Sequence, residues 1–179
     1  NSIGKPIIHG MYGSRVGIVT DDFRQYDQQW GPDHAPNIDF DSFETIQLIK
    51  GAAALKYGGD TSAGSLILSS KRKALKDTLF GSSLVYLESN GRGGKISSRL
   101  EKNYSNGLYI SGNFTGKRYG DFNTPNYNLT NTGFREANFS IKLGKDLVAK
   151  GWNIKYSSYS LEPGILKASH IGNVQDLYF

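Results

Sequence analysis

The stretch IQLIKGAAALKYGGDTSAGSLILSSKR, Ile46 to Arg72, contains the features that decide the fold. Two apolar segments enclose a basic residue, a Gly-Ala corner, a short helical patch and a Gly-rich turn. We expect a strand over 43–50, at most two turns of helix over 52–58, and a strand over 63–71. Gly58 is expected to end the helix in the left-handed conformation. This order of segments predicts a compact, tightly turning module and excludes an ordinary helical core.

The residues before this stretch have the same mixed character. RVGIVTDDF, 15–23, reads as a short apolar strand that ends in a turn at an Asp pair. The segment 25–42 is rich in Pro, Asp and Gly, and it reads as a long loop. Residues 1–73 are therefore expected to form a small mixed α/β domain with three strands and one short helix. Its hydrophobic centre is expected to consist of Ile18, Ile46, Leu48, Leu66 and Leu68.

Residues 74–179 follow a different pattern, the strict alternation of two faces. In KISSRLEKNY, 95–104, every odd position is polar, and the even positions include Ile96, Leu100 and Tyr104. The same alternation runs through 108–117, 135–146 and 152–158, and more faintly through 79–89. Period two indicates strands, so we expect five consecutive antiparallel strands of about ten residues each. Alternation alone fits a transmembrane barrel and a sheet with one solvated face equally well.

Composition excludes several classes of function. The 179 residues carry a net charge of +5 and no Cys, which excludes disulfides, Cys-based zinc sites and thiol nucleophiles. No apolar run approaches the roughly 20 residues of a transmembrane helix, which leaves a β-barrel as the route into a membrane. No hydrolase motif is visible, so we expect no enzyme. The net charge is read as a solvated basic surface, and we expect no nucleic-acid partner, no cofactor and no assigned metal site.

The first 73 residues resemble the plug of the TonB-dependent outer-membrane receptors. The matching segments occur in the family's order: PIIHG at 6–10, GSRVGIVTDD at 13–22, WGPDHAPNID at 30–39, ETIQLIKGAAALKYG at 44–58 and AGSLILSSKR at 63–72. The chain departs from the family pattern at His9, Asp22, Ala52, Gly59 and Ser65, where the family usually has Arg, Gly, Pro, Ser and Gly. None of these departures removes an expected element.

The resemblance implies a fold that is mainly β: a small mixed α/β plug, 1–73, followed by the first strands of a transmembrane β-barrel, 74–179. A barrel of about 22 strands has a lumen too wide for side chains to fill, which is why it holds a plug. Five strands leave two open edges, and unpaired backbone in lipid costs several kcal/mol per group. The chain is therefore expected to be a fragment of a longer receptor whose remaining strands complete the barrel.

The resemblance also implies a function. A receptor of this family would sit in the outer membrane of a Gram-negative bacterium and bind a scarce ligand: an iron chelate, haem, cobalamin, a metal or a glycan. It would import that ligand with energy transmitted by TonB, whose contact segment is expected upstream of Asn1. Outer-membrane lipid and lipopolysaccharide would be its other partners. The alternative is a soluble β-rich module that binds a small ligand or a glycan.

Two sets of site residues follow from the resemblance. Trp30, Asp33 and His34 lie in a loop that resembles one in zinc-importing receptors, and they are expected to contact ligand at the plug apex. A His that bonds locally and a Trp that packs under the loop remain open as alternatives. Lys50 stands where the family carries a plug Arg that pairs with barrel carboxylates, so it is expected to help gate the lumen. A solvated lysine is its alternative.

The alternation also predicts which side chains face lipid and which face the plug. The connections at 90–95 and 124–132 are expected outside, and those at 105–107 and 147–151 on the periplasmic side. Side chains predicted to face lipid are Leu108, Ile110, Phe114, Phe139, Ile141, Trp152 and Ile154. Side chains predicted to face the lumen or plug are Asn113, Asn138, Ser140 and Lys155.

Overall fold

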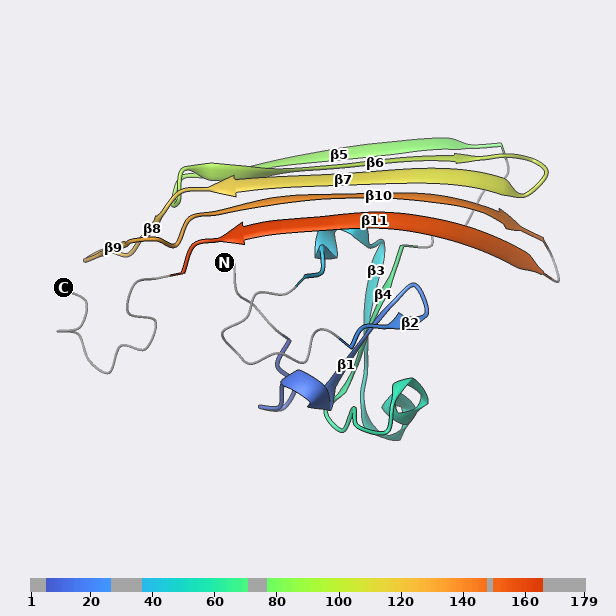
Figure 1. The fold of residues 1–179 in the computed structure, drawn as a ribbon, viewed down its shortest axis with the longest axis horizontal. Coiled ribbons are helices and arrows are strands. Elements are labelled where there is room, and N and C mark those ends of the chain that lie inside the picture. The colour runs from blue at the N-terminus through green and yellow to red at the C-terminus, as the bar shows by residue number, and fades with distance from the viewer. Residues whose placement is uncertain (1–5, 27–36, 71–76, 148–149, 166–179) are drawn as a thin grey trace.

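The computed structural model describes residues 6–26, 37–70, 77–147 and 150–165. These residues form a four-stranded sheet, a five-stranded sheet and a small two-stranded sheet (Figure 1). We call the described part of residues 6–70 the plug and the five-stranded sheet the wall. The long strands of the wall arch over the plug, whose strands run across them (Figure 1). Within the described ranges, no helix has the length and apolar character needed to cross a membrane.

The plug is built on one mixed sheet. Its elements are η1 (Gly13–Arg15), β1 (Val16–Thr20), β2 (Phe23–Arg24), η2 (Phe40–Ser42), β3 (Thr45–Ile49), η3 (Gly51–Tyr57) and β4 (Gly64–Ser69). The strand order is β2-β1-β4-β3, with β1 parallel to β4 and the other neighbours antiparallel. The three expected strands are therefore present as β1, β3 and β4, and the expected helical patch is the 3₁₀ helix η3. The two-residue strand β2 was not expected.

Two glycines frame η3 and behave differently. Gly51 has φ 66°, the left-handed conformation that the tight corner after β3 requires. Gly58 ends η3 with φ 150° and ψ 137°, so the expected left-handed stop is wrong. The Arg24 guanidinium, which donates a hydrogen bond to Asp60, fills the space beside Gly58. A side chain at Gly58 would displace that guanidinium, and its φ of 150° is a conformation that residues other than Gly rarely adopt.

The hydrophobic centre of the plug is smaller than expected. Ile18, Ile38 and Leu68 are buried together, and Phe40, Phe43 and Leu66 pack against them. The prediction that Ile46 and Leu48 belong to this centre is wrong, since they are 55% and 45% exposed. Their register with Leu68 and Leu66 does place them on the same face. However, β3 is the edge strand, and the aromatic cover from η2 and its flanks packs over the central strands instead.

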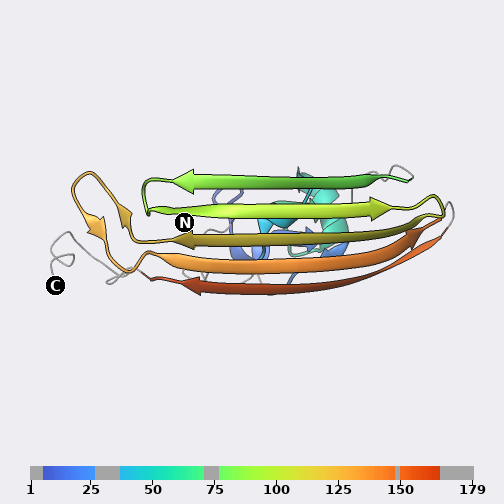
Figure 2. The ribbon, with the colours of Figure 1, turned by 90° about the horizontal axis from the view of Figure 1, so that it is seen from above.

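The wall confirms the expected run of antiparallel strands. It consists of β5 (Leu79–Glu88), β6 (Gly93–Asn103), β7 (Leu108–Tyr119), β10 (Phe134–Asp146) and β11 (Gly151–Pro163). The order β11-β10-β7-β6-β5 makes each strand pair with its predecessor and successor, and no curvature closes the sheet on itself (Figure 2). The boundary predicted at residue 73 falls in 71–76, outside the described residues.

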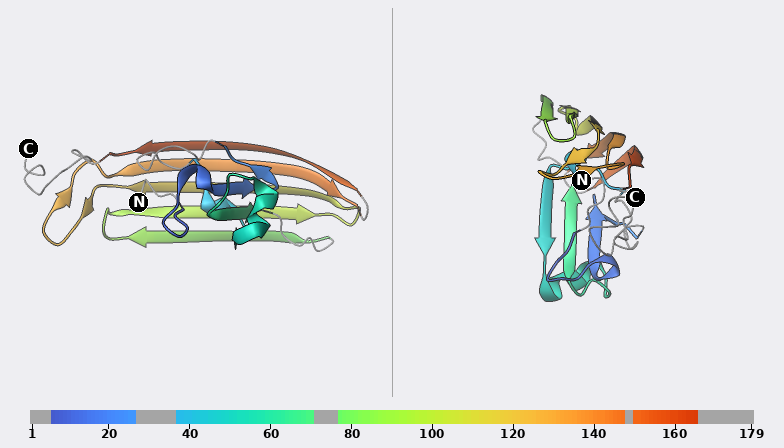
Figure 3. Two further views of the ribbon diagram at one scale, coloured as in Figure 1. Left: turned by 90° about the horizontal axis from the view of Figure 1, so that it is seen from below. Right: turned by 90° about the vertical axis from the view of Figure 1, so that its left-hand side faces the viewer.

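The wall has one face against the plug and one away from it, as the alternation predicts. Side chains on the outer face are between 42% and 68% exposed: Ile110, Phe114, Phe139, Ile141, Trp152 and Ile154. Leu108 shares that face and is half-buried. On the other face, Asn138 and Ser140 are buried beneath the plug, and Asn113 and Lys155 are half-buried there. Figure 3 shows the plug covering the middle of this inner face.

The two ends of the wall differ. Short turns join β6 to β7 and β10 to β11 at one end, whereas the β7–β10 connection at the other end extends as a hairpin (Figure 2). That hairpin contains β8 (Phe122–Asn123) and β9 (Asn128–Leu129). Phe122 stacks near Tyr119 and Phe134, whose ring centroids are 4.9 Å apart, so aromatic packing holds the base of the hairpin.

Candidate functional site: the plug–wall interface

The plug presents carboxylates where its chain turns next to the wall. Asp21 lies in the turn after β1 with φ 46°, a conformation that Asp tolerates better than most residues. Asp39 caps η2, and its side chain accepts a hydrogen bond of 3.1 Å from the Asp41 backbone N–H. Glu44 follows η2 just before β3. The turn after β1 and the segment around η2 thus place four acidic side chains at one edge of the plug: Asp21, Asp39, Asp41 and Glu44.

The wall carries cations on its inner face, opposite these carboxylates. Lys95 and Arg99 of β6, Lys117 of β7 and Lys155 of β11 all occupy positions that point to the plug. Their spacing follows from the period of two, because inner positions recur at every second residue. At the interface, basic side chains of the wall therefore face acidic side chains of the plug.

Asp21 joins the plug to the last described wall strand. Its carboxylate accepts a hydrogen bond of 2.7 Å from Lys155 Nζ, and it also accepts from the backbone N–H and the hydroxyl of Ser70. Burial raises the pKa of Asp21, but the bonds from Lys155 and Ser70 outweigh it and hold that pKa below the ordinary 3.8. The Asp21 side chain is only 12% exposed, so this pair is shielded from bulk water. It is stronger than an ordinary surface pair.

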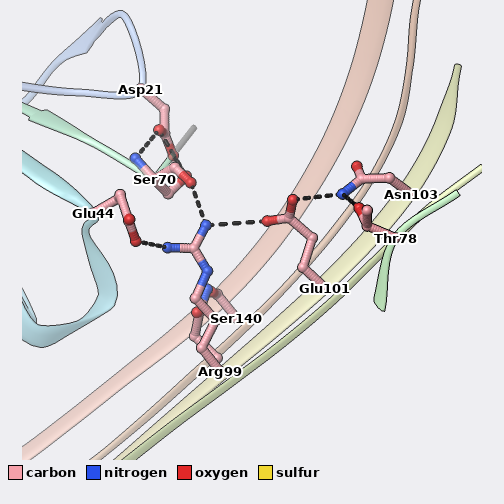
Figure 4. A network of polar contacts seen from close by, with 9 residues as sticks. Asp21, Glu44, Ser70, Thr78, Arg99, Glu101, Asn103 and Ser140 are labelled. Carbon is pink, nitrogen blue, oxygen red and sulfur yellow. Dashed lines mark hydrogen bonds and ion pairs between the residues drawn. The ribbon is translucent and has the colours of Figure 1, made fainter. Parts of the chain in front are cut away.

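Arg99 bridges plug and wall through both terminal nitrogens (Figure 4). Nη1 donates to Glu44 at 2.8 Å, and Nη2 donates to the Ser70 carbonyl at 2.7 Å. Nη2 also lies 3.1 Å from Glu101 of its own strand, and Glu101 accepts in turn from Asn103 at 2.9 Å. The buried Glu101 lies on the same strand as Arg99 and compensates part of the guanidinium charge from the wall side. Arg99 is therefore a preformed binding group for the plug.

Lys117 and Lys95 hold η2 between them. Lys95 Nζ lies 2.7 Å from one Asp41 oxygen, and Lys117 Nζ lies 3.0 Å from the other. Lys117 also lies 3.0 Å from Glu136 of β10 and 3.7 Å from Asp39. Burial raises the pKa of Asp41, yet the two lysines outweigh it and hold that pKa below 3.8. Asp41 is thus the most heavily bridged carboxylate of the described interface.

A cavity of about 130 Å³ with a mixed polar and apolar lining lies beside these pairs, between the plug and the wall. Plug residues Asn37 and Asp39 line one side, and wall residues Asn113, Asn138 and Ser140 line the other. Such a space is large enough and polar enough for several water molecules. Ion pairs and a space that can hold water therefore meet here, beside Ile38 and Phe43 at the edge of the hydrophobic centre.

The predicted site residues fall in three different situations. Trp30, Asp33 and His34 lie in 27–36, outside the described residues. Lys50 is the exposed N-cap of η3, and it forms no ion pair with any residue that the structure describes. Lys155, predicted only to face the plug, pairs directly with Asp21.

Sequence reasoning missed the four plug carboxylates. The sequence predicts only a turn at the Asp pair 21–22, places Asp39 and Asp41 in the loop 25–42, and places Glu44 in the strand 43–50. The available signal was charge: 37–44 carries three acidic residues and no basic one, whereas Lys95, Arg99, Lys117 and Lys155 share inner wall positions. Matching those two sets predicts the interface, but only after the plug has been placed against β6, β7 and β11.

Comparisons with known proteins agree with this architecture. A family model of the TonB-dependent receptor plug domain matches residues 1–65. The structure is similar to that of the copper transporter OprC, with a TM-score of 0.79 at 15% sequence identity over 92% of this chain. The chain spans about a quarter of that protein, 26% of its length. No curated protein sequence matches the chain. Residues 1–65 thus match the TonB-dependent receptor plug domain, and the described part of the chain has the fold of the corresponding part of OprC.

Proposed function

We propose that this chain belongs to a TonB-dependent transporter of the outer membrane, which binds a scarce ligand outside and imports it through the lumen. Its location in a Gram-negative outer membrane and its coupling to TonB are parts of the same proposal. The plug match and the fold support it. The observation that carries it is the plug–wall interface, in which ion pairs hold the plug in place.

An interface of this kind suits a plug that must seal and then move. Water can solvate each carboxylate and each cation after the plug separates from the wall, which lowers the cost of breaking the ion pairs. Exposed pairs contribute about 1 kcal/mol or less, whereas partly buried ones cost more to break singly. The ion pairs between plug and wall lie between the exposed and the buried case, since their side chains are 7% to 36% exposed. A pull applied to the plug can break them one after another.

We also propose a role for Lys50, at the end of the plug that carries η3. The η3 end of the plug points away from the five described strands (Figure 1). In a closed barrel, it would face strands that follow residue 179, and we propose that Lys50 pairs with carboxylates there. Lys50→Gln in the complete receptor should raise leakage of a small hydrophilic antibiotic and leave ligand binding intact. Lys56→Gln, a change of the same charge in η3, is the control, and equal permeability of the two variants would reject the role.

Ligand contact is proposed for Trp30, Asp33 and His34 at the plug apex. An imidazole beside a carboxylate suits a metal ion, and the indole suits a flat organic ligand. OprC is a copper transporter, so copper joins iron chelates, haem, cobalamin, zinc and glycans as a candidate.

Uptake by living cells tests the function. Cells that express the complete receptor should accumulate one of these labelled ligands only when TonB is present and the inner membrane is energised. Deletion of TonB should abolish uptake but leave binding at the cell surface. Uptake that continues without TonB, or a receptor that fractionates with soluble proteins, would contradict the proposal.

A further inference from the structure

The inner face of the wall carries two pairs of lysines that lie directly opposite one another. Lys95 of β6 is the register partner of Lys117 of β7. Lys142 of β10 is the register partner of Lys155 of β11, so it shares the inward face from which Lys155 reaches the plug. Side chains in such positions start about 5 Å apart, and like charges there repel one another. An anion between the two members of a pair would remove that repulsion.

The first pair shows how such an anion is held. One oxygen of the plug residue Asp41 lies 2.7 Å from Lys95 Nζ, and the other lies 3.0 Å from Lys117 Nζ. Each carboxylate oxygen therefore has one ammonium partner. Glu136, 3.0 Å from Lys117, adds a second negative charge. Two opposed lysines on this wall thus form a binding unit for one carboxylate, and the charge of the first unit is fully compensated.

The second pair is only half compensated. Lys155 Nζ lies 2.7 Å from Asp21, which is the carboxylate that the plug contributes here. Lys142 is half-buried, and it forms no hydrogen bond or ion pair with any residue that the structure describes. The pair therefore carries two positive charges against one negative charge, and Lys142 remains available to an incoming anion.

The surroundings of Lys142 offer further donors to an anion. Ser111 is the register partner of Lys142 on β7, and Tyr109 places its ring against Gly144, two residues further along β10. Among the described residues, neither hydroxyl has a hydrogen-bond partner, so both can donate. Glu101 is the register partner of Ser111 on β6, but it already accepts hydrogen bonds from two side chains of its own strand. The charge of Glu101 is therefore compensated within β6.

We propose that Lys142 and Lys155 bind an anionic group of the imported ligand, a carboxylate or a phosphate, as the first pair binds Asp41. That group would bridge the two ammonium groups and displace Asp21 from Lys155 by forming charge-assisted hydrogen bonds. The inference rests on the proposed function, which places this inner face on the route of the ligand. Among the candidate ligands, it selects those that carry carboxylates, such as haem and carboxylate iron chelates, over free metal cations and neutral glycans.

Binding of this anion also weakens the docking of the plug. Asp21 holds the plug to the wall through Lys155, so a ligand carboxylate and the plug carboxylate compete for one ammonium group. Two groups that compete for one partner weaken each other's binding by the same factor. The negative charge of the ligand therefore favours the undocked plug.

The first test measures anion binding to the purified complete receptor, with sodium citrate as a carboxylate probe. A water-soluble acylating reagent labels the lysines slowly, and mass spectrometry gives the rate at each lysine. Citrate should slow the labelling of Lys142 and leave Lys145 unchanged, because Lys145 lies three residues further along β10 on the outer face. Citrate should also speed hydrogen exchange in β1 and β4, since it displaces Asp21.

Variants then assign these responses to the lysine pair. Lys142→Gln should raise the citrate concentration that speeds exchange in β1 and β4 about fivefold, the effect of one partly exposed ion pair. Lys145→Gln removes the same charge from the outer face of the same strand and should leave that concentration unchanged. Equal responses of the two variants, or labelling of Lys142 that citrate does not slow, would overturn the proposal.

Uptake by cells separates a ligand anion from a free anion. The labelled probes are haem, ferric citrate, zinc and copper. We expect TonB-dependent uptake of haem or ferric citrate, and Lys142→Gln should lower it while Lys145→Gln does not. Anion binding in the purified receptor with equal uptake by both variants would show a site for free anions only and overturn the role in import. TonB-dependent uptake of zinc or copper alone would also overturn it, but would leave the proposed function standing.

Discussion

Asp21→Asn tests the plug–wall interface at its most sharply defined contact. The substitution removes the negative charge but keeps the shape, and Asn tolerates the left-handed backbone at this position as Asp does. An amide oxygen can still accept from the Ser70 backbone and hydroxyl. The change is therefore confined to the charge-assisted bond from Lys155, which is 2.7 Å long in the intact protein.

The expected cost follows from the burial of the two partners. A hydrogen bond to a charged group contributes about 1.5–3 kcal/mol. Lys155 is 25% exposed, and Asp21 is 12% exposed, so water screens part of this interaction. We expect about 1–2 kcal/mol, which is roughly a five- to thirtyfold shift toward the undocked plug.

Hydrogen exchange of the complete receptor measures that shift. Amides of β1 and β4 should exchange faster by the same factor, while amides of the wall should not change. Asp22→Asn is a matched control, because Asp22 has φ 73°, is exposed and makes no hydrogen bond or ion pair with a described residue. Lys155→Gln should reproduce the effect, and the two substitutions together should add little more.

Two results would refute the reasoning. If Asp21→Asn and Asp22→Asn exchange alike, the charge of Asp21 does not hold the plug. If the effects of Asp21→Asn and Lys155→Gln simply add, the two side chains act separately, and the pair is not an energetic unit.

Three further predictions concern pH, the plug centre and the wall. Asp41 has a lowered pKa in the docked plug, so its contribution is present above pH 3.8 and is lost as pH falls through that lowered pKa. Antibiotic leakage should therefore rise only below pH 3.8 and should not change between pH 5 and pH 7. Leu68→Ala should destabilise the plug by about 2–5 kcal/mol and the exposed Leu48→Ala by under 1, and equal denaturation midpoints would contradict this packing. With a membrane-impermeant thiol reagent, Ser140→Cys should react faster than Ile141→Cys once the plug is loosened, and the reverse order would place the wall inside out.

The wall was predictable because each strand repeats one local rule. Alternation placed Phe139 outward and Ser140 inward with no knowledge of neighbouring strands, and the short turns then fixed the order. The plug was harder, since burial there depends on what covers each strand. Ile46 and Leu68 are register partners on one face, yet Leu68 is fully buried and Ile46 is not. The difference in burial arises because Phe40 and Phe43 pack over the cluster that contains Leu68.

The interface depended on contacts between residues far apart in the chain. Asp21 and Lys155 are separated by 134 positions, and no local pattern links them. The resemblance directed attention to a plug cation, Lys50, whereas the described interface uses plug carboxylates and wall cations. Both sets of contacts can exist in one receptor. Asp21 follows the end of β1 that pairs with Leu68, whereas Lys50 follows the end of β3 that pairs with Ser65, at the opposite end of β4.

The central claim is that the plug rests on the wall through Asp21 and must leave it for import. Residues 1–179 contain no Cys, so Asp21→Cys with Lys155→Cys introduces the one thiol pair of this part of the receptor, and a short bis-maleimide can bridge it. The decisive measurement is ligand uptake by cells carrying the complete receptor with these two changes, before and after crosslinking. We predict that the crosslink forms, that uptake then stops, and that surface binding of ligand persists. Uptake that continues at its full rate with the plug crosslinked to the wall would contradict the account.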